Sequence, residues 1–191
     1  MFIFYTQYIG IKLTHYSLII LITKIFDGIN DPIVGALIYR FTSKDSQDKF
    51  KPWIKWGGII LSFSAAVMFI DSSSWNYTAR LLICTLSYIL WDVCYTFVNV
   101  PYGSLNAVMT DDSKERTKLS TARSFGGLTG GSLIGFLIPI FAYGDQIVSG
   151  ETKSIFLGER MFVIAVFLGV IAIISFYLTV KTWKNVSFML P

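Results

Sequence analysis

Five long apolar stretches alternate with shorter polar connectors along this chain. They are residues 13–39, 53–70, 79–109, 120–143 and 160–180. An α-helix needs roughly 20 residues to cross a bilayer, so each stretch is a candidate transmembrane helix. The third is longer than that, and we expect it to tilt or to kink at Pro101. The pattern predicts a bundle of about five transmembrane helices.

The basic residues gather on one set of connectors, which sets the predicted orientation. Because cytoplasmic loops carry an excess of Lys and Arg, we place this richer side in the cytoplasm. It carries Arg40, Lys44, Lys49, Lys51, Lys55, Lys114, Arg116, Lys118, Lys181 and Lys184, against Lys12, Arg80, Lys153 and Arg160 on the other side. The amino end is then outside, and residues 1–6 read as the tail of a preceding span rather than as a signal peptide.

Composition supports an all-α polytopic membrane protein. The 191 residues have a mean hydropathy of +0.59, and 15% are charged, against about 25% in a soluble domain. The apolar runs are too long for barrel strands. The net charge of +4 reflects topology, so we expect no nucleic-acid partner. Cys84 and Cys94 lie in an apolar segment and are predicted to be packed thiols.

Two carboxylates and an amide interrupt the first apolar stretch. Asp27, Asn30 and Asp31 are spaced i, i+3, i+4, which places them on one helical face. A central Asp costs roughly 2.5–3.5 kcal/mol on insertion scales, so such residues normally face a bundle interior or a water cavity. Clustered oxygen ligands suit a small hard cation or a proton. Lys24, one turn earlier, is a candidate charge partner that keeps Asp27 ionised.

A second polar stripe runs along the third stretch. Asp92, Tyr95, Thr96, Asn99 and Gly103 are spaced i, i+3, i+4, i+7 and i+11, so they share one face. Thr and Asn in this setting also serve as simple interhelical hydrogen bonds. Arg123, at the start of the fourth stretch, either reaches into a cavity or is a boundary charge. Glycines 126, 127, 130, 131 and 135 predict close helix packing.

Several segments resemble one family of membrane carriers. The sequence FDGINDP at 26–32 is similar to the W-D-x-x-N-D-P signature of the glycoside-pentoside-hexuronide:cation symporters, a melibiose-carrier-like branch of the major facilitator superfamily. KFKPW at 49–53 resembles the R-F-R-P-W of that family, and NVPYGSL at 99–105 resembles its N-I-P-Y-x-x-L. The residues from Met109 to Arg123 resemble the loop that follows.

The resemblance implies roles by position. Asp27, Asn30, Asp31 and Thr96 match the cation site of the family, with Na⁺ a candidate at Asp27 and Asp31, although a proton or Li⁺ fits equally. Tyr95, Asn99, Gly103 and Arg123 match positions where members contact the sugar. Melibiose carriers have an acid in place of Asn99 and a Trp in place of Gly103, so a sugar other than melibiose is indicated.

The resemblance also implies how this chain relates to a whole carrier. Its helices correspond to helices two to six of a twelve-helix protein, without most of helix one or the second half. We expect a partial amino-terminal bundle at 1–180 and a cytoplasmic linker or tail at 181–191. The expected function is sugar:cation symport across a bacterial plasma membrane, with this chain as a truncated or split half-carrier that is not competent alone, and without enzymatic activity or a cofactor. The expected partners are a sugar or glycoside, membrane lipid and a separately encoded carboxy-terminal half.

Two alternatives remain open at this point. The chain could be a remnant that transports nothing, with a structural role only. It could also be an intramembrane phosphotransferase, because Asp27-Gly28 resembles the D-G of CDP-alcohol phosphotransferases. The second alternative is weak, since Asp31-Pro32 stands where that family needs Ala-Arg.

Overall fold

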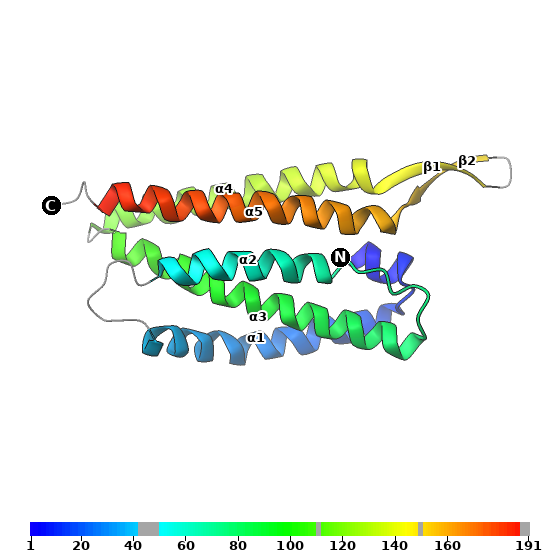
Figure 1. Ribbon diagram of the computed structural model, residues 1–191, viewed down its shortest axis with the longest axis horizontal. Helices are drawn as coiled ribbons and strands as arrows, with labels where there is room; N and C mark the ends of the chain where they lie inside the picture. Colours follow the sequence, from blue (N-terminus) through cyan, green and yellow to red (C-terminus); the bar gives the residue numbers. More distant parts are fainter. Residues whose placement is uncertain (42–49, 110–111, 149–150, 188–191) are drawn as a thin grey trace.

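Five long helices lie side by side in an elongated bundle (Figure 1). The computed structural model describes residues 1–41, 50–109, 112–148 and 151–187. The helices are α1 (Leu13–Phe41), α2 (Lys51–Val67), α3 (Tyr77–Met109), α4 (Ser113–Ala142) and α5 (Gly158–Ser187). The prediction of five helices in an all-α bundle is confirmed. Lys44 and Lys49 of the predicted cytoplasmic side lie outside the described residues.

Capping side chains explain where two of the helices begin. The Asp112 carboxylate accepts a hydrogen bond from the Lys114 backbone N–H at 2.9 Å, which starts α4 ahead of the predicted residue 120. The Asn76 side-chain oxygen accepts from the Ala79 N–H at 2.7 Å and starts α3. At the other end of the chain, α5 continues past the predicted end at Val180. The assignment of residues 181–191 to a cytoplasmic linker or tail stays a prediction.

Three of the five helices are long and apolar enough, by length and composition, to cross a membrane. Within the described residues these are Tyr77–Ser104, Ser113–Ala142 and Gly158–Thr182. α2 has 17 residues, and α1 carries Lys24, Asp27 and Asp31 along its middle. By these criteria α2 is too short to be a candidate membrane span, and α1 is too polar because of its charged residues. Many large apolar side chains of α4 and α5 are exposed, as a lipid-facing surface requires.

The short helix α2 joins the two sides of the bundle. It packs against α3 on one side and α5 on the other, while α1 packs against α3 and α4 against α5. Two adjacent glycines permit these approaches. A Cβ on Gly57 would lie 2.8 Å from a methyl carbon of Val98, and one on Gly58 would lie 2.6 Å from a ring carbon of Phe176. Only glycine fits both contacts without displacing a neighbour.

The amino-terminal residues form part of the core at the end of the bundle opposite the α4 start. A short π-helical turn, η1 (Phe4–Tyr8), packs against α1 and α5, and its buried residues share a core with Met68, just after α2, and with Cys84 of α3. Tyr5 is fully buried, and its hydroxyl lies 3.3 Å from the carbonyl oxygens of both Met68 and Cys84. Cys84 and Cys94 are free and buried, as predicted.

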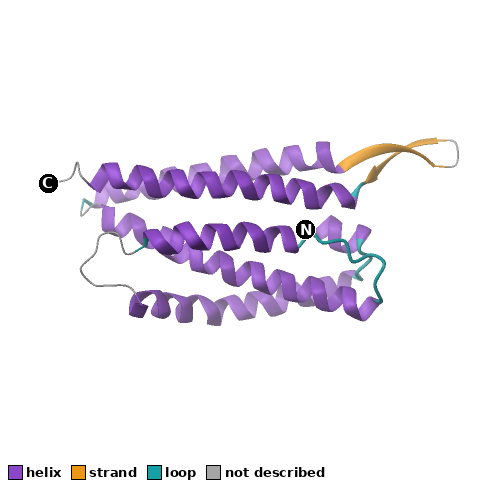
Figure 2. Cartoon of the chain, viewed as in Figure 1, coloured by secondary structure: helices purple, strands orange, loops and turns teal. Residues whose placement is uncertain are grey.

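A β-hairpin extends from the same end and was not predicted from the sequence (Figure 2). Strand β1 (Tyr143–Val148) pairs antiparallel with β2 (Glu151–Phe156), in the register Tyr143↔Phe156 and Gly144↔Ile155. We expected only a polar connector here. The segments lack a clear alternation of apolar and polar residues, and an edge-to-face contact between Tyr143 and Phe156 at 5.5 Å closes the base of the hairpin.

Gly58→Ala should destabilise the bundle by about 1–3 kcal/mol, because the new methyl group would overlap the Phe176 ring. The measurement is the free energy of unfolding in detergent. Gly131→Ala is the matched control, since nothing lies within 4 Å of a Cβ at that helical position. Equal stability of both variants would contradict the packing that we describe between α2 and α5.

Candidate functional site

The seam between α1 and α3 carries the predicted cation residues. The buried face of α1 runs through Ile19, Thr23, Val34 and Ile38, and Asp27 and Asn30 fall on the same helical face. Across the seam, the Thr96 hydroxyl donates a hydrogen bond to Asp31 Oδ1 at 3.0 Å. The structure therefore brings together residues that are 65 positions apart in the chain.

Lys24 and Asp27 form an ion pair on α1. The Lys24 ammonium lies 2.7 Å from Asp27 Oδ2, with 61% and 21% of the two side chains exposed. This ion pair is the contact that the sequence predicted for Lys24 as the charge partner of Asp27. The role of the pair at a cation site stays a prediction. Because Asp27 is only partly exposed, the pair holds one carboxylate of the site in place at the edge of the seam.

Asp92 belongs to this site, although the sequence reasoning left it without a role. It lies one turn before Thr96 and is 4% exposed. Its side chain interacts with that of Asp27, and its Oδ2 atom is buried without a hydrogen-bond partner. The polar stripe on α3 pointed to this face, but only the packing of α1 shows which acid Asp92 meets.

The remaining predicted cation residue, Asn30, is incompletely bonded. Its amide nitrogen is buried and has no hydrogen-bond partner. Among the described residues, no group of three or more His, Cys, Asp or Glu side chains is arranged to hold a metal ion. Asp27, Asp31, Thr96 and Asn30 carry oxygen atoms of the kind that suits a hard monovalent ion or a proton, and their role as a cation site stays a prediction.

The predicted sugar residues meet between α3 and α4. The Arg123 guanidinium donates to the Asn99 side-chain oxygen at 2.7 Å. It also lies 4.6 Å from the centre of the Tyr102 ring, a cation–π contact. A Cβ on Gly103 would lie 3.2 Å from an Arg123 nitrogen, so the glycine leaves room for the guanidinium. Tyr102 was part of the quoted motif but not of the predicted site.

A cavity of about 340 Å³ opens beside these residues. Three of the four predicted sugar residues, Tyr95, Asn99 and Arg123, line it. The Tyr95 ring also stacks on Trp91, with centroids 5.5 Å apart. The other lining residues are Leu61, Val98, Tyr102, Gly126, Gly127 and Phe176. The cavity thus combines an amide, a guanidinium and aromatic surfaces, which suits a ligand with hydroxyl groups and apolar faces.

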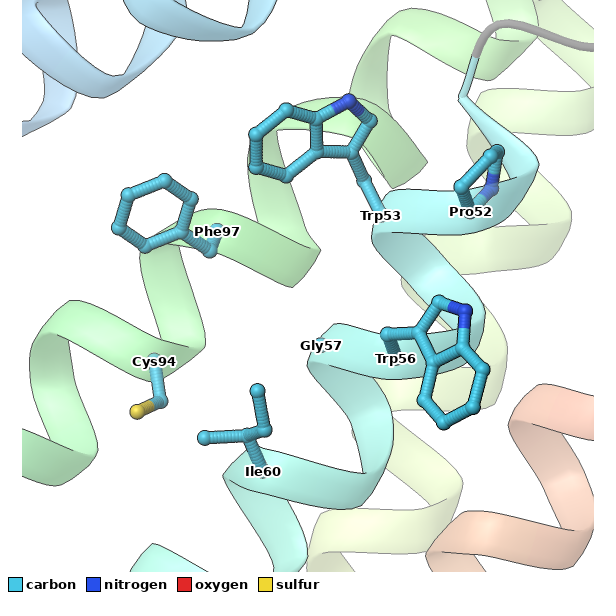
Figure 3. Close-up of a pocket in the computed structure, with 7 residues that line it drawn as sticks. All are labelled: Pro52, Trp53, Trp56, Gly57, Ile60, Cys94 and Phe97. Atoms are coloured by element: carbon cyan, nitrogen blue, oxygen red, sulfur yellow. The ribbon is translucent and has the colours of Figure 1, made fainter.

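A second cavity, of about 460 Å³, lies between α2 and α3 and is apolar (Figure 3). It is lined by Pro52, Trp53, Trp56, Gly57, Ile60, Cys94 and Phe97. Trp53 and Phe97 stack with their centroids 5.8 Å apart. Pro101 frees the Phe97 carbonyl from its helical hydrogen bond, and that oxygen lies 3.9 Å from a Cβ position on Gly57. The freed carbonyl therefore faces α2 and not the acidic seam.

The apolar helices of the bundle, with polar clusters between them, are those of a polytopic membrane protein. A family model described as MFS/sugar transport protein matches residues 1–188, and the chain belongs to this family. This confirms the family that the sequence motifs indicated. The chain is thus a multi-pass membrane protein of the major facilitator superfamily.

Three bacterial relatives illustrate the similarity. The uncharacterized symporter YjmB of Bacillus subtilis is 38% identical over 125 residues, covering 65% of this chain and 27% of that protein. A putative glycoside/cation symporter of Escherichia coli, YagG, is 31% identical over 149 residues, or 76% of this chain and 32% of its own length. The raffinose carrier protein of Pediococcus pentosaceus is 30% identical over 165 residues, which cover 83% of this chain and 24% of that protein. The chain spans about a quarter to a third of these relatives.

Thr96→Val should weaken the contact between α1 and α3 by about 1–2 kcal/mol, because it removes the donor to Asp31 and keeps the side-chain shape. Unfolding in detergent measures the loss. Thr85→Val is the control on the same helix, since the Thr85 hydroxyl donates only to the Leu81 carbonyl one turn before. If the two variants lose the same stability, the bond to Asp31 contributes nothing across the seam.

Proposed function

We propose that this chain provides the cation-binding and sugar-binding side of a glycoside:cation symporter and catalyses no chemical reaction. One observation carries the proposal: α3 presents both clusters within a single turn. Thr96, which binds Asp31 on α1, is three residues before Asn99, which binds Arg123 on α4. A rigid helix transmits a change at one cluster to the other.

The coupling follows from electrostatics at the seam. A cation or proton bound at Asp27 and Asp31 reduces the repulsion between carboxylates and orders α1 against α3 through Thr96. Because Asn99 belongs to the same helix, the sugar contacts are then held in one arrangement. By linkage, a cation that strengthens sugar binding is itself bound more tightly when sugar is present. An ion gradient then drives the sugar inward.

The chemistry of the cavity favours a glycoside as substrate. Arg123 and Asn99 supply hydrogen-bond donors and acceptors for sugar hydroxyl groups, and Tyr95 and Tyr102 supply faces for stacking on the ring. The names of the relatives, a glycoside/cation symporter and a raffinose carrier, support the same class. Asn99 and Gly103 favour a sugar other than melibiose.

A second helical bundle completes the cavity in this proposal. Alternating access needs one bundle to rock against another around the site. The glycines of α4 offer a close-packing surface for it, because nothing lies within 4 Å of a Cβ at Gly126, Gly127 or Gly130. The first two also line the sugar cavity. The partner would be a carboxy-terminal half, whether separately encoded or continuous with this chain.

Asp31→Asn should abolish cation-dependent sugar accumulation while sugar binding without the cation remains, because the charge that attracts the cation is lost. The measurement is uptake of labelled raffinose and methyl glycosides into vesicles containing the chain together with the carboxy-terminal half that the proposal requires, with Na⁺ and pH gradients applied in turn. Asp145→Asn, on the exposed hairpin strand β1, is the control. Unaltered uphill uptake by Asp31→Asn would refute the assigned role.

Arg123→Lys should lower sugar affinity about 10–100-fold, since an ammonium cannot reproduce the planar fork that binds Asn99 and a sugar hydroxyl together. Equilibrium binding of the same labelled glycosides measures the effect, and membrane insertion should be unchanged. The matched control is Arg116→Lys on the same helix, at an exposed position outside the cavity. Equal affinities for the two variants would place the sugar elsewhere.

A further inference from the structure

The apolar cavity between α2 and α3 has no part in the proposed transport site. Among the described residues its walls come from these two helices, and its volume is about 460 Å³ (Figure 3). It extends along α2 from Pro52 to Ile60, a rise of about 12 Å. Cys94 of α3 is buried in its wall, whereas Trp56 and Ile60 are 61% and 56% exposed. The cavity is therefore a groove that opens on the surface of the bundle.

The lining of this groove excludes a sugar and favours a hydrocarbon chain. Its residues are proline, tryptophan, glycine, isoleucine, cysteine and phenylalanine. They carry no hydroxyl, amide or charged side chain that could replace the water lost by sugar hydroxyl groups. In a multi-pass membrane protein, an open groove along an apolar helix meets the acyl chains of lipid. The groove thus suits one acyl chain lying along α2.

Polar groups lie beside the groove near the start of α2. The Lys55 ammonium lies 5.5 Å from the centre of the Trp56 ring, which lines the groove. Within the described part of the chain, Lys55 pairs with no carboxylate, and the indole N–H groups of Trp53 and Trp56 have no protein acceptor. Lys51, one turn earlier, is buried, whereas Lys55 is exposed. A positive charge and two donors are therefore available to a ligand at this end of the groove.

We propose that the groove binds a phospholipid with an anionic head group. One acyl chain lies along α2 toward Ile60 and covers Cys94, while the lipid phosphate and ester carbonyls accept from Lys55 and the two indoles. Tryptophan and lysine are the residues that contact lipid at a membrane surface. A zwitterionic lipid offers the same chain, but its own ammonium opposes Lys55. A lysine at such a surface favours anionic lipid about fivefold. This site does not depend on the proposed symport.

Fluorescence quenching by brominated lipids tests the proposal on the full chain. The protein is placed in vesicles of phosphatidylcholine and phosphatidylglycerol, with dibrominated acyl chains on one lipid or the other. Bromine quenches a tryptophan that it contacts, so the loss of emission from Trp53 and Trp56 reports which lipid fills the groove. A protein with Phe at both positions gives the emission of the other tryptophans, which is subtracted. We expect phosphatidylglycerol to be preferred about fivefold, and equal quenching by the two lipids would overturn the proposal.

Lys55→Gln tests the contact with the head group. The preference for phosphatidylglycerol should disappear, while both lipids still quench because the apolar groove is unchanged. Lys114→Gln is the matched control, since Lys114 is exposed at the start of α4 and does not line the groove. A preference that persists in a folded Lys55→Gln protein would contradict the proposed contact.

Glycerol 3-phosphate distinguishes a lipid from a free phosphate compound, because it carries the phosphate without acyl chains. An excess of it should leave quenching by brominated phosphatidylglycerol unchanged, since the acyl chain supplies binding that the competitor lacks. Loss of the lipid preference in its presence would show a site for soluble phosphates and would overturn the lipid assignment.

Discussion

The absence of water inside a bilayer constrains this structure more than any other factor. Polar side chains there must be satisfied by other parts of the protein, and α1 places Lys24, Asp27, Asn30 and Asp31 in its middle turns. The helix is tolerated because α3 lies beside it and Thr96 donates a hydrogen bond to Asp31, while Lys24 pairs with Asp27 on α1 itself. The same pairing that makes α1 compatible with a membrane also gathers the acids into one cluster. The stability of the bundle and the proposed cation site thus depend on the same helix–helix contact.

The helix α3 then connects that cluster to the rest of the bundle. It meets α1 through Thr96, α2 through the contact of Val98 with Gly57, and α4 through Asn99 and Arg123. Thr96, Val98 and Asn99 lie within about one helical turn of α3. The contacts of α3 with α1, α2 and α4 therefore lie at nearly the same height along the bundle. Pro101 lies just beyond this level, and the carbonyl that it frees belongs to the α2 contact. The packing contacts and the residues predicted to bind the cation and the sugar consequently share the same short segment.

Hydropathy was sufficient to locate the five helices, because an apolar run of about 20 residues has few alternatives in a membrane protein. It located their ends less well. α4 begins earlier than its apolar run, since the Asp112 cap extends the helix into polar sequence. The hairpin β1–β2 escaped prediction because its pairing depends on contacts across the loop, such as that of Tyr143 with Phe156, rather than on a local pattern.

The sequence by itself determined the class of protein, the family and the two polar faces on the first and third apolar stretches, because hydropathy, residue spacing and motifs are properties of a single segment. Only the tertiary structure decided which faces meet. It paired Asp31 with Thr96 and Arg123 with Asn99, turned the freed Phe97 carbonyl toward α2, and set Asp92 against Asp27. Helical periodicity fixes the direction in which a side chain points from the helix axis. Which residue it meets depends on how the neighbouring helices are rotated and how closely they approach. In this bundle the close approach of α2 to α3 and α5 depends on the absence of side chains at Gly57 and Gly58.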